Sequence, residues 1–454
     1  MVDLARHSDA HSVHRMSDTT DALVIGGGPG GSTIATLLRR KGWRVVLCEK
    51  EHHPRFHVGE SLLPLNLPVF ARLGVLDQVK RIGVLKYGAD FSSHQQADKT
   101  ETIYFSDALD KRHPYAFHVR RSEFDHLLLK NSAAEGVVVR EGVGVKGVIF
   151  RSGQPHLVRA ADDRGDEHEW QARFVIDASG RDTFLAGKLG LKRKNKKHQS
   201  AAIFAHFENV TRRIGKDEGN ISIYWFQHGW FWMIPLQGGI ASVGAVCWPE
   251  YLKTRRSHLE EFFWETIRLC PGVHKRMQRA KVVGEVRATG NYSYRAARMY
   301  GDGYLLVGDA FSFIDPVFSS GVYLAMNSAA LGAEAVDAQL RGSPSANRPM
   351  KKFDREVRRG LRVFSWLIYR FTSPAIQELF MAPRNVFRMK KAIISVLAGD
   401  VFSNRAVKLP LALFKVVYYV TWLKELTRAW SAYRRRRRNV QIHYADGEIF
   451  PESL

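Results

Sequence analysis

The stretch that decides the fold is "ALVIGGGPGGSTIATLLRRKGWRVVLCEK", residues Ala22 to Lys50. An apolar run, a glycine-rich turn, a segment with helical periodicity and a second apolar run predict strand, turn, helix and strand. Gly26, Gly28 and Gly31 have the spacing G-x-G-x-x-G, and Glu49 ends the second strand. Such glycines let the helix N-terminus approach a pyrophosphate, and the acid can bind ribose hydroxyls. The pattern favours an FAD or NAD(P) site over a tight turn with incidental glycines.

Composition limits the class of protein. The chain has 454 residues, of which 45% are hydrophobic and 25% charged, so we expect a globular protein with two or three structural units. Its cysteines, Cys48, Cys247 and Cys270, are far apart, which argues against disulfides or a metal site and fits the cytoplasm. The net charge of +23 predicts an acidic partner. Nucleic acid is not expected, because no nucleic-acid-binding motif accompanies the charge.

The order of predicted elements indicates an α/β (α+β) fold. Residues 1–19 are polar and are predicted to be a disordered leader. Residues 20–345 are predicted to form a discontinuous nucleotide-binding unit, with antiparallel strands in about 85–120 and 200–290 that contribute the substrate portion. Residues 346–454 have helical patterns. We therefore expect a helical C-terminal region to follow the nucleotide-binding unit.

Within that region, Ala406 to Trp422 is strongly apolar but contains Lys408, Pro410 and Lys415. It is too short and too interrupted to predict a transmembrane helix, so a packed helix is favoured. The arginine run Arg434 to Arg438 follows shortly after. Because basic clusters beside apolar helices bind anionic membranes, peripheral membrane contact is the alternative.

Three further stretches favour FAD. "VIDASGR" ends a strand at Val175 to Arg181, "RSEFDHLLL" places Arg121 at the head of a helix, and "VGDAFSFIDP" places Asp309 after an apolar strand. With the glycine turn they resemble the FAD-dependent monooxygenase superfamily, which implies a Rossmann-like three-layer FAD domain. The resemblance implies these cofactor-binding residues: Gly26, Gly28, Pro29, Gly30, Gly31, Ser32, Glu49, Glu60, Ser61, Arg121, Asp177, Gly180, Gly308, Asp309, Pro316, Gly321 and Val322.

Four elements make the chain resemble the flavin-dependent halogenases, especially the phenol and pyrrole type. They are "HVGESLLP" at His57 to Pro64, "KYGADF" at Lys86 to Phe91, "WFWMIP" at Trp230 to Pro235 and "FIDPVFSSG" at Phe313 to Gly321. The resemblance implies that FADH2 from a separate flavin reductase, with oxygen and chloride or bromide, yields hypohalous acid. Lys86, the implied catalytic residue, then passes electrophilic halogen to an aromatic ring.

The local sequence gives these roles a physical basis. Ser319, Ser320 and Gly321 precede a helical pattern, whose positive end can bind a halide beside the flavin. Apolar neighbours of Lys86 would favour its neutral, reactive amine, although a surface lysine with a packed stem is the common alternative. The bulky residues Trp230, Trp232, Pro235 and Phe318 are predicted to separate flavin from substrate.

One difference from the tryptophan halogenases bears on the substrate. Tryptophan halogenases carry a glutamate where this chain has Phe318, so a phenol, resorcinol or pyrrole, free or on an acidic carrier protein, is the better prediction. An FAD-dependent aromatic monooxygenase or isoprenoid reductase of the same fold is the first alternative. An inactive FAD-binding regulatory protein is the second.

Overall fold

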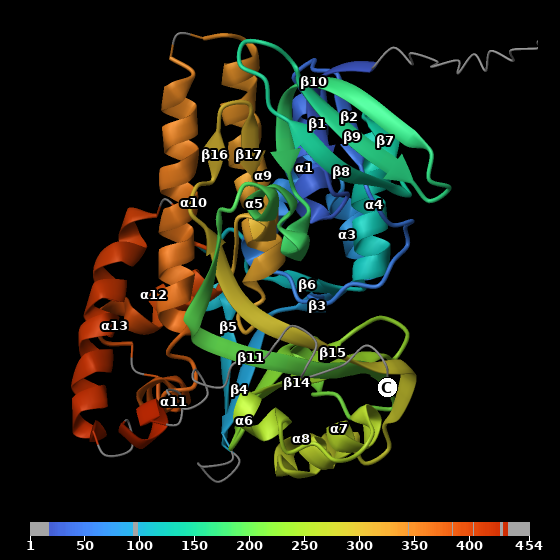
Figure 1. The fold of residues 1–454 in the computed structure, drawn as a ribbon. Helices are drawn as coiled ribbons and strands as arrows, with labels where there is room; N and C mark the ends of the chain where they lie inside the picture. Colours follow the sequence, from blue (N-terminus) through green and yellow to red (C-terminus); the bar gives the residue numbers. More distant parts are fainter. Residues whose placement is uncertain are drawn as a thin grey trace, which may run out of the picture.

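The computed structural model describes residues 18–93, 99–343, 345–383, 385–402, 404–426 and 430–434 (Figure 1). Strand β1 begins at Asp18, so the nucleotide-binding unit starts two residues before the predicted boundary. The rest of the predicted leader, residues 1–17, lies outside the described residues, as does most of the arginine run after Arg434.

Strands and helices both occur up to β18 (Ser312–Phe313), and the described residues after it form helices and the loops that join them. The strands are β1 Asp18–Ile25, β2 Val45–Cys48, β3 Gly83–Lys86, β4 Gly88–Ser93, β5 Lys99–Tyr104, β6 Ala116–Val119, β7 Val138–Arg140, β8 Val143–Ile149, β9 His156–Asp162, β10 Glu167–Asp177, β11 Lys192–Glu208, β12 Ile221–Phe226, β13 Gly229–Pro235, β14 Ala241–Cys247, β15 Lys281–Ala296, β16 Tyr300–Gly301, β17 Tyr304–Leu306 and β18 Ser312–Phe313. The α-helices are α1 Pro29–Arg40, α2 Leu67–Leu73, α3 Leu76–Ile82, α4 Arg121–Ala134, α5 Phe184–Lys188, α6 Pro249–Leu252, α7 Leu259–Arg268, α8 Pro271–Met277, α9 Ser320–Leu340, α10 Asn347–Ile368, α11 Pro374–Met381, α12 Met389–Leu397 and α13 Arg405–Lys424.

The first sheet is the nucleotide-binding sheet, with β1 at its centre. Its main path is β16-β17-β10-β1-β2-β7, and β9 and β8 extend it from β10. Strand β1 pairs in parallel with both β10 and β2, and α1 packs against α9 and α4. Because ligands bind beyond the carboxyl ends of parallel strands in such folds, the site is expected at the ends of β1, β2 and β10. The α/β fold class is confirmed.

Close packing at the start of α1 fixes the glycine turn. Gly26 has a φ of +102°, and a Cβ on Gly31 would lie 1.8 Å from the Gly26 carbonyl oxygen. Any side chain at position 31 would therefore separate the helix from the strand that precedes it. Only glycine lets α1 start directly above the end of β1.

The second sheet is the predicted substrate portion, with the order β18-β15-β11-β14-β13-β12-β4-β5. It is antiparallel as expected, except that β12 pairs in parallel with β4. Alternation along β13 serves two cores: Trp230, Trp232 and Ile234 face the main core, whereas Phe231 and Met233 face a second core under α7 and α8. A period of two therefore places both tryptophans on one face. Figure 1 shows this sheet beneath the nucleotide-binding unit.

The C-terminal region is helical through its described part. Helices α10 to α13 lie along one side of both sheets (Figure 1). The connection between α10 and α11 carries Phe371, which is 1% exposed and packs against Trp225 and Trp230. This region therefore completes the core beside the tryptophan strand.

The glycine contact gives a matched pair of variants. Gly31→Ala should lower the free energy of unfolding by about 2 kcal/mol or more, because backbone on both sides must move to admit a methyl group. Gly30→Ala is the control, since its Cβ would meet only ordinary contacts at 3.6 Å and beyond and alanine favours a helix. Urea denaturation measures both. Equal stability of the two variants would contradict the packing argument.

Candidate functional site

A cavity of about 420 Å³ opens at the predicted edge of the first sheet. Its walls come from the glycine turn, the end of β2, the segment from Arg55 to Ser61, the end of β10, strand β13 and the start of α9. These segments are far apart in the chain and meet because the carboxyl ends of β1, β2 and β10 lie together.

Most of the predicted cofactor residues line this cavity. They are Gly26, Gly28, Pro29, Gly30, Glu49, Glu60, Ser61, Arg121, Gly180, Gly308, Asp309, Pro316, Gly321 and Val322. Partial burial raises the pKa of Asp309 to about 6. The structure thus gathers residues predicted from six separate stretches of sequence.

Three predicted cofactor residues have a different place and support the turns from behind. Gly31 packs on the Gly26 carbonyl, and the Ser32 hydroxyl donates to the Gly27 carbonyl at 3.0 Å. Asp177 is fully buried, and its carboxylate accepts the backbone N–H groups of Ser179 at 2.9 Å and Leu185 at 2.7 Å. In the described structure the cavity is lined by their neighbours instead. Direct contact of these three residues with the cofactor stays a prediction.

The glycine turn has the shape that a dinucleotide needs. The nearest atom to a Cβ built on Gly28 is Arg55 Nη2 at 3.8 Å, so this glycine lies directly beside a cationic group. Glu49 Oε2 accepts the Gly27 N–H at 2.6 Å, and Oε1 accepts the Glu51 N–H at 3.0 Å. These bonds orient the carboxylate while leaving lone pairs for ribose hydroxyls. The residues present therefore fit FAD.

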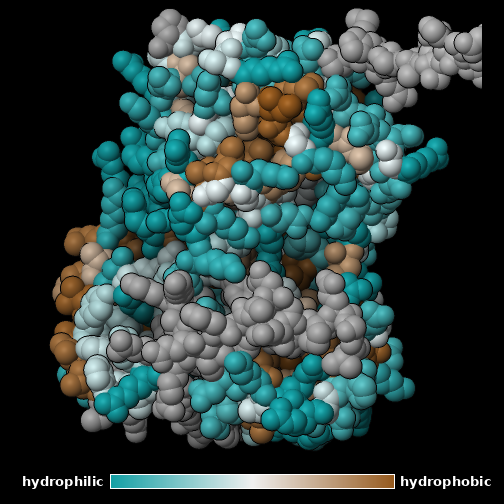
Figure 2. All heavy atoms as spheres, in the orientation of Figure 1, coloured by the Kyte–Doolittle hydropathy of each residue, from teal (hydrophilic) through white to brown (hydrophobic). Residues whose placement is uncertain are grey.

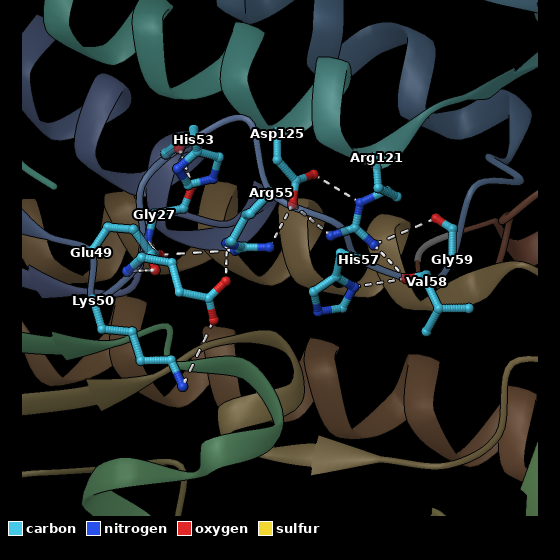
Figure 3. A network of polar contacts seen from close by, with 12 residues as sticks. Gly27, Glu49, Lys50, His53, Arg55, His57, Val58, Gly59, Arg121 and Asp125 are labelled. Atoms are coloured by element: carbon cyan, nitrogen blue, oxygen red, sulfur yellow. Dashed lines mark hydrogen bonds and ion pairs between the residues drawn. The ribbon is translucent and has the colours of Figure 1, made fainter. Parts of the chain in front are cut away.

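Arg55 is a cavity residue that the sequence reasoning missed. Figure 3 shows it between two carboxylates, with Nη2 3.9 Å from Glu49 Oε2 and Nη1 3.6 Å from Asp125 Oδ2. Its side chain is only 14% exposed. A cation fixed beside the glycine turn can bind a pyrophosphate. Its position six residues after Glu49 was the available signal.

Arg121 organises the segment that leads from Arg55 to Ser61. It makes two bonds to Asp125, at 2.8 and 2.9 Å, and Nη1 donates to the Val58 carbonyl at 2.8 Å. His57 Nδ1 donates to the same carbonyl at 2.8 Å, as Figure 3 shows. The Arg121 charge and burial lower the pKa of His57 to about 4, which keeps the ring neutral. The arginine thus fixes the backbone that presents Glu60 and Ser61 to the cavity.

Lys86 meets the cavity wall through Ser61. The ammonium Nζ donates to Ser61 Oγ at 2.9 Å and to the Leu62 carbonyl at 3.2 Å, and it lies 5.2 Å from the centre of the Phe105 ring. The residue is 2% exposed, and burial lowers the pKa of its amine to about 7. A substantial fraction of the amine is therefore neutral and nucleophilic at neutral pH.

A buried histidine beside Lys86 was also missed. His118 pairs with Val84 across strands β3 and β6, and with Ser61 across an isolated bridge. Because opposed residues share a face, its ring lies on the same side as Ser61 and Lys86. It is fully buried, and its pKa lies well below the usual value because of burial and the Lys86 charge. The ring is therefore neutral, and no nearby sequence motif signals its place.

The tryptophan strand forms the wall between the cavity and an aromatic cluster. Trp230 and Trp232 line the cavity, and Trp232 Nε1 donates to Ser242 Oγ at 3.1 Å. Phe318 and Pro235 are also buried, but among the described residues neither lines the cavity. Phe318 instead packs edge-on against Phe371, 5.2 Å between ring centres. Phe371, which the sequence reasoning missed, contacts both Trp230 and Phe318, whereas a partition between flavin and substrate stays a prediction.

The start of α9, where an anion site was predicted, reaches the cavity, and Ser320 and Gly321 belong to its first turn instead of preceding it. Ser319, Ser320 and Gly321 line the cavity, and Ser319 precedes the helix with a φ of +57°. In the described structure no side chain caps this end. First-turn amides and the helix dipole therefore remain for an anion at the cavity surface.

Comparisons with known proteins agree with this geometry. The family described as "FAD binding domain" matches residues 19–357. The chain is 30% identical over 407 residues to a 1H-pyrrole-2-carbonyl peptidyl-carrier-protein chlorinase from Pseudomonas fluorescens, covering 85% of this chain and 90% of that protein.

Two solved structures are similar over nearly their whole length. A flavoprotein/dehydrogenase from Cytophaga hutchinsonii has a TM-score of 0.83 and 31% identity, covering 90% of this chain and 100% of its own. The myxobacterial chondrochloren halogenase has a TM-score of 0.74 and 33% identity, covering 89% and 97%.

The buried lysine predicts a specific dependence of stability on pH. The unfolded lysine keeps its proton up to a pKa of 10.5, whereas the folded one releases it at about 7. The folded state therefore gains stability as the pH rises from about 7 to 10.5. Below about pH 7 the amine is charged in both states, and the full free-energy cost of burying that charge applies. Lys86→Met should raise the free energy of unfolding by a few kcal/mol near neutral pH, less the cost of leaving Ser61 unbonded, and the gain should shrink in alkali.

Urea denaturation across that pH range measures the effect. Lys80→Met, which replaces an exposed lysine on α3, is the matched control and should leave the pH dependence unchanged. Parallel pH profiles for wild type and Lys86→Met would contradict the assignment of a lowered pKa to this amine.

Proposed function

Because the chain belongs to the flavin-dependent halogenases, we propose that it transfers halogen through the Lys86 amine to an electron-rich aromatic ring. It is an FADH2-dependent oxidoreductase that uses FAD and halide. The single observation that carries the proposal is the buried lysine, whose Nζ donates to a serine in the wall of the FAD cavity.

One part of the site oxidises the halide, and another part transfers the halogen to the substrate. Reduced FAD, when bound, supplies with oxygen the oxidising power that converts halide to hypohalous acid. The first-turn amides at Ser320 and Gly321 hold the halide beside the cofactor. Glu49, Arg55 and Arg121 orient the nucleotide. Oxidation and transfer of the halogen thereby occur at different places.

Lys86 then carries the halogen. Its neutral amine attacks the halogen of hypohalous acid, an N–halogen bond forms, and hydroxide leaves with the amine proton as water. The aromatic ring next attacks that halogen, the N–halogen bond breaks, and the ring loses a proton, which restores the amine. Burial makes the neutral amine available, and the bond to Ser61 keeps Nζ facing the cavity wall.

The substrate we propose is a phenol, resorcinol or pyrrole, because such rings are activated by their own hydroxyl or nitrogen. Phe318 stands where tryptophan halogenases carry a glutamate, so this position supplies no carboxylate. The carrier-linked pyrrole of the Pseudomonas relative and the net charge of +23 support an aromatic group held by an acidic carrier protein. The reduced cofactor is supplied by a separate flavin reductase.

The reaction itself gives the central test. Lys86→Ala should lower the rate of halogenated product by about 10²-fold or more, while FAD binding, followed by flavin fluorescence, persists. Lys80→Ala is the control and should retain full activity. Reduced enzyme is mixed with oxygen, chloride or bromide and a panel of phenols and carrier-bound pyrroles, and products are identified by mass spectrometry. Products that gain oxygen and no halogen would refute the halogenase assignment for this chain.

The tryptophan wall gives a second test, because β13 offers residues of opposite orientation. Trp232→Ala and Phe231→Ala should each cost about 3–5 kcal/mol of stability. Only Trp232→Ala opens the cavity toward the substrate side, so it alone should increase hydroxylated product and uncoupled peroxide per halogenation. The same product ratio in both variants would remove the proposed role of the wall.

A further inference from the structure

Helix α13 has an apolar face that points away from the protein. Leu409, Val416 and Leu423 follow one another at intervals of seven and are 69%, 60% and 60% exposed. Tyr419 and Leu426, three residues after two of them, are 46% and 48% exposed. Residues separated by three, four and seven share a helix face, so these side chains form one stripe, here called the outer stripe.

The same pattern extends past the helix. Trp430 lies seven residues after Leu423 and is 50% exposed, and Tyr433 is 49% exposed. Residues 430–434 are helical, and the two rings stack with centres 5.6 Å apart. The outer stripe therefore ends in a tryptophan and a tyrosine, the side chains that favour the boundary between membrane and water.

A different face of α13 fastens it to the protein. Val407, Leu411, Phe414 and Tyr418 are buried, about half a turn from the outer stripe. Phe414 and Tyr418 pack edge-on against Trp366 of α10. Tyr419 lies at the border between the two faces, because it packs edge-on against Trp366 and accepts a hydrogen bond from Arg370 Nη2 at 3.0 Å. The three aliphatic residues spaced by seven in the outer stripe stay at least 60% exposed. Figure 2 shows hydrophobic side chains exposed along the edge where Figure 1 places α13.

The charges around the outer stripe select among possible occupants. From Arg405 to Arg434 the sequence has six basic residues and one acidic residue, Glu425. Arg405, Lys408, Lys424 and Arg434 are exposed, and Arg434 lies over the Trp430 ring, 5.4 Å from its centre. Pairing with a second copy would bring like charges together, whereas an anionic surface complements both the charges and the apolar stripe.

We propose that α13 docks this protein on an anionic lipid bilayer, with the outer stripe among the acyl chains and the basic side chains at the head groups. By length and composition alone the helix could span a membrane, but its packed inner face keeps it on the body of the protein. It therefore lies in the plane of the interface.

Vesicle sedimentation with the full-length, FAD-loaded protein tests the proposal and needs no turnover. We expect binding to phosphatidylcholine vesicles that contain phosphatidylglycerol, weak binding to phosphatidylcholine alone, and release at high salt. Replacing Leu409, Val416 and Leu423 together by Gln should lower partitioning by about tenfold or more, with unchanged FAD binding. Ile214→Gln is the control, because Ile214 is 90% exposed far from α13 in the sequence.

Two results would overturn the proposal. One is equal binding by the triple variant and the wild type, which would assign any attraction to charge elsewhere. The other is absence of vesicle binding together with a dimer, seen by sedimentation velocity, that the triple variant loses; this would make the outer stripe a contact between copies. Neither result bears on halogenation, which is assayed separately with soluble substrates.

Discussion

The contact between Gly31 and the Gly26 carbonyl is the constraint on which the site depends. It lets α1 begin directly above the end of β1, and this position sets the space faced by Gly28 and Arg55. The carboxylate of Glu49 then fixes the loop from the adjacent strand through the Gly27 amide. A dinucleotide site is thereby formed by the backbone geometry of the turn together with the Glu49 carboxylate that holds it.

Burial of a lysine is the second feature with chemical consequences. A lysine amine in solution is protonated at neutral pH. Lys86 instead lies on β3, which pairs with β6, and packs beside the Phe105 ring. Among the described residues no carboxylate pairs with it, and burial lowers the pKa of its amine to about 7. Burying the amine lowers the free energy of unfolding, and burial of the large apolar core offsets this loss. Ser61 joins this amine to the cofactor cavity, which is the geometry that the proposed halogen transfer requires.

Predictions from sequence were best where backbone geometry imposes residue type. The glycine turn, the acid after β2 and the alternating tryptophans follow from local rules of spacing. The helix after the serine pair was also predicted, although it begins at Ser320 and includes Gly321, which was expected to precede it. Arg55, His118 and Phe371 were missed, because each acts through neighbours that are distant in the chain: Asp125, Ser61 and Trp230. Asp177 was predicted to bind the cofactor because it ends a strand, and the structure adds that its carboxylate accepts two local backbone amides.

The sequence by itself determined the α/β fold class, the dinucleotide turn and the resemblance to flavin-dependent halogenases, because periodicity and glycine spacing are local properties of the chain. Only the tertiary structure decided that Lys86 is buried and bonded to Ser61, that Phe371 packs against the tryptophan strand, and that α13 leaves its outer stripe uncovered. The physical reason is that burial, and with it the pKa of an amine or the exposure of an apolar face, depends on which distant segments pack together.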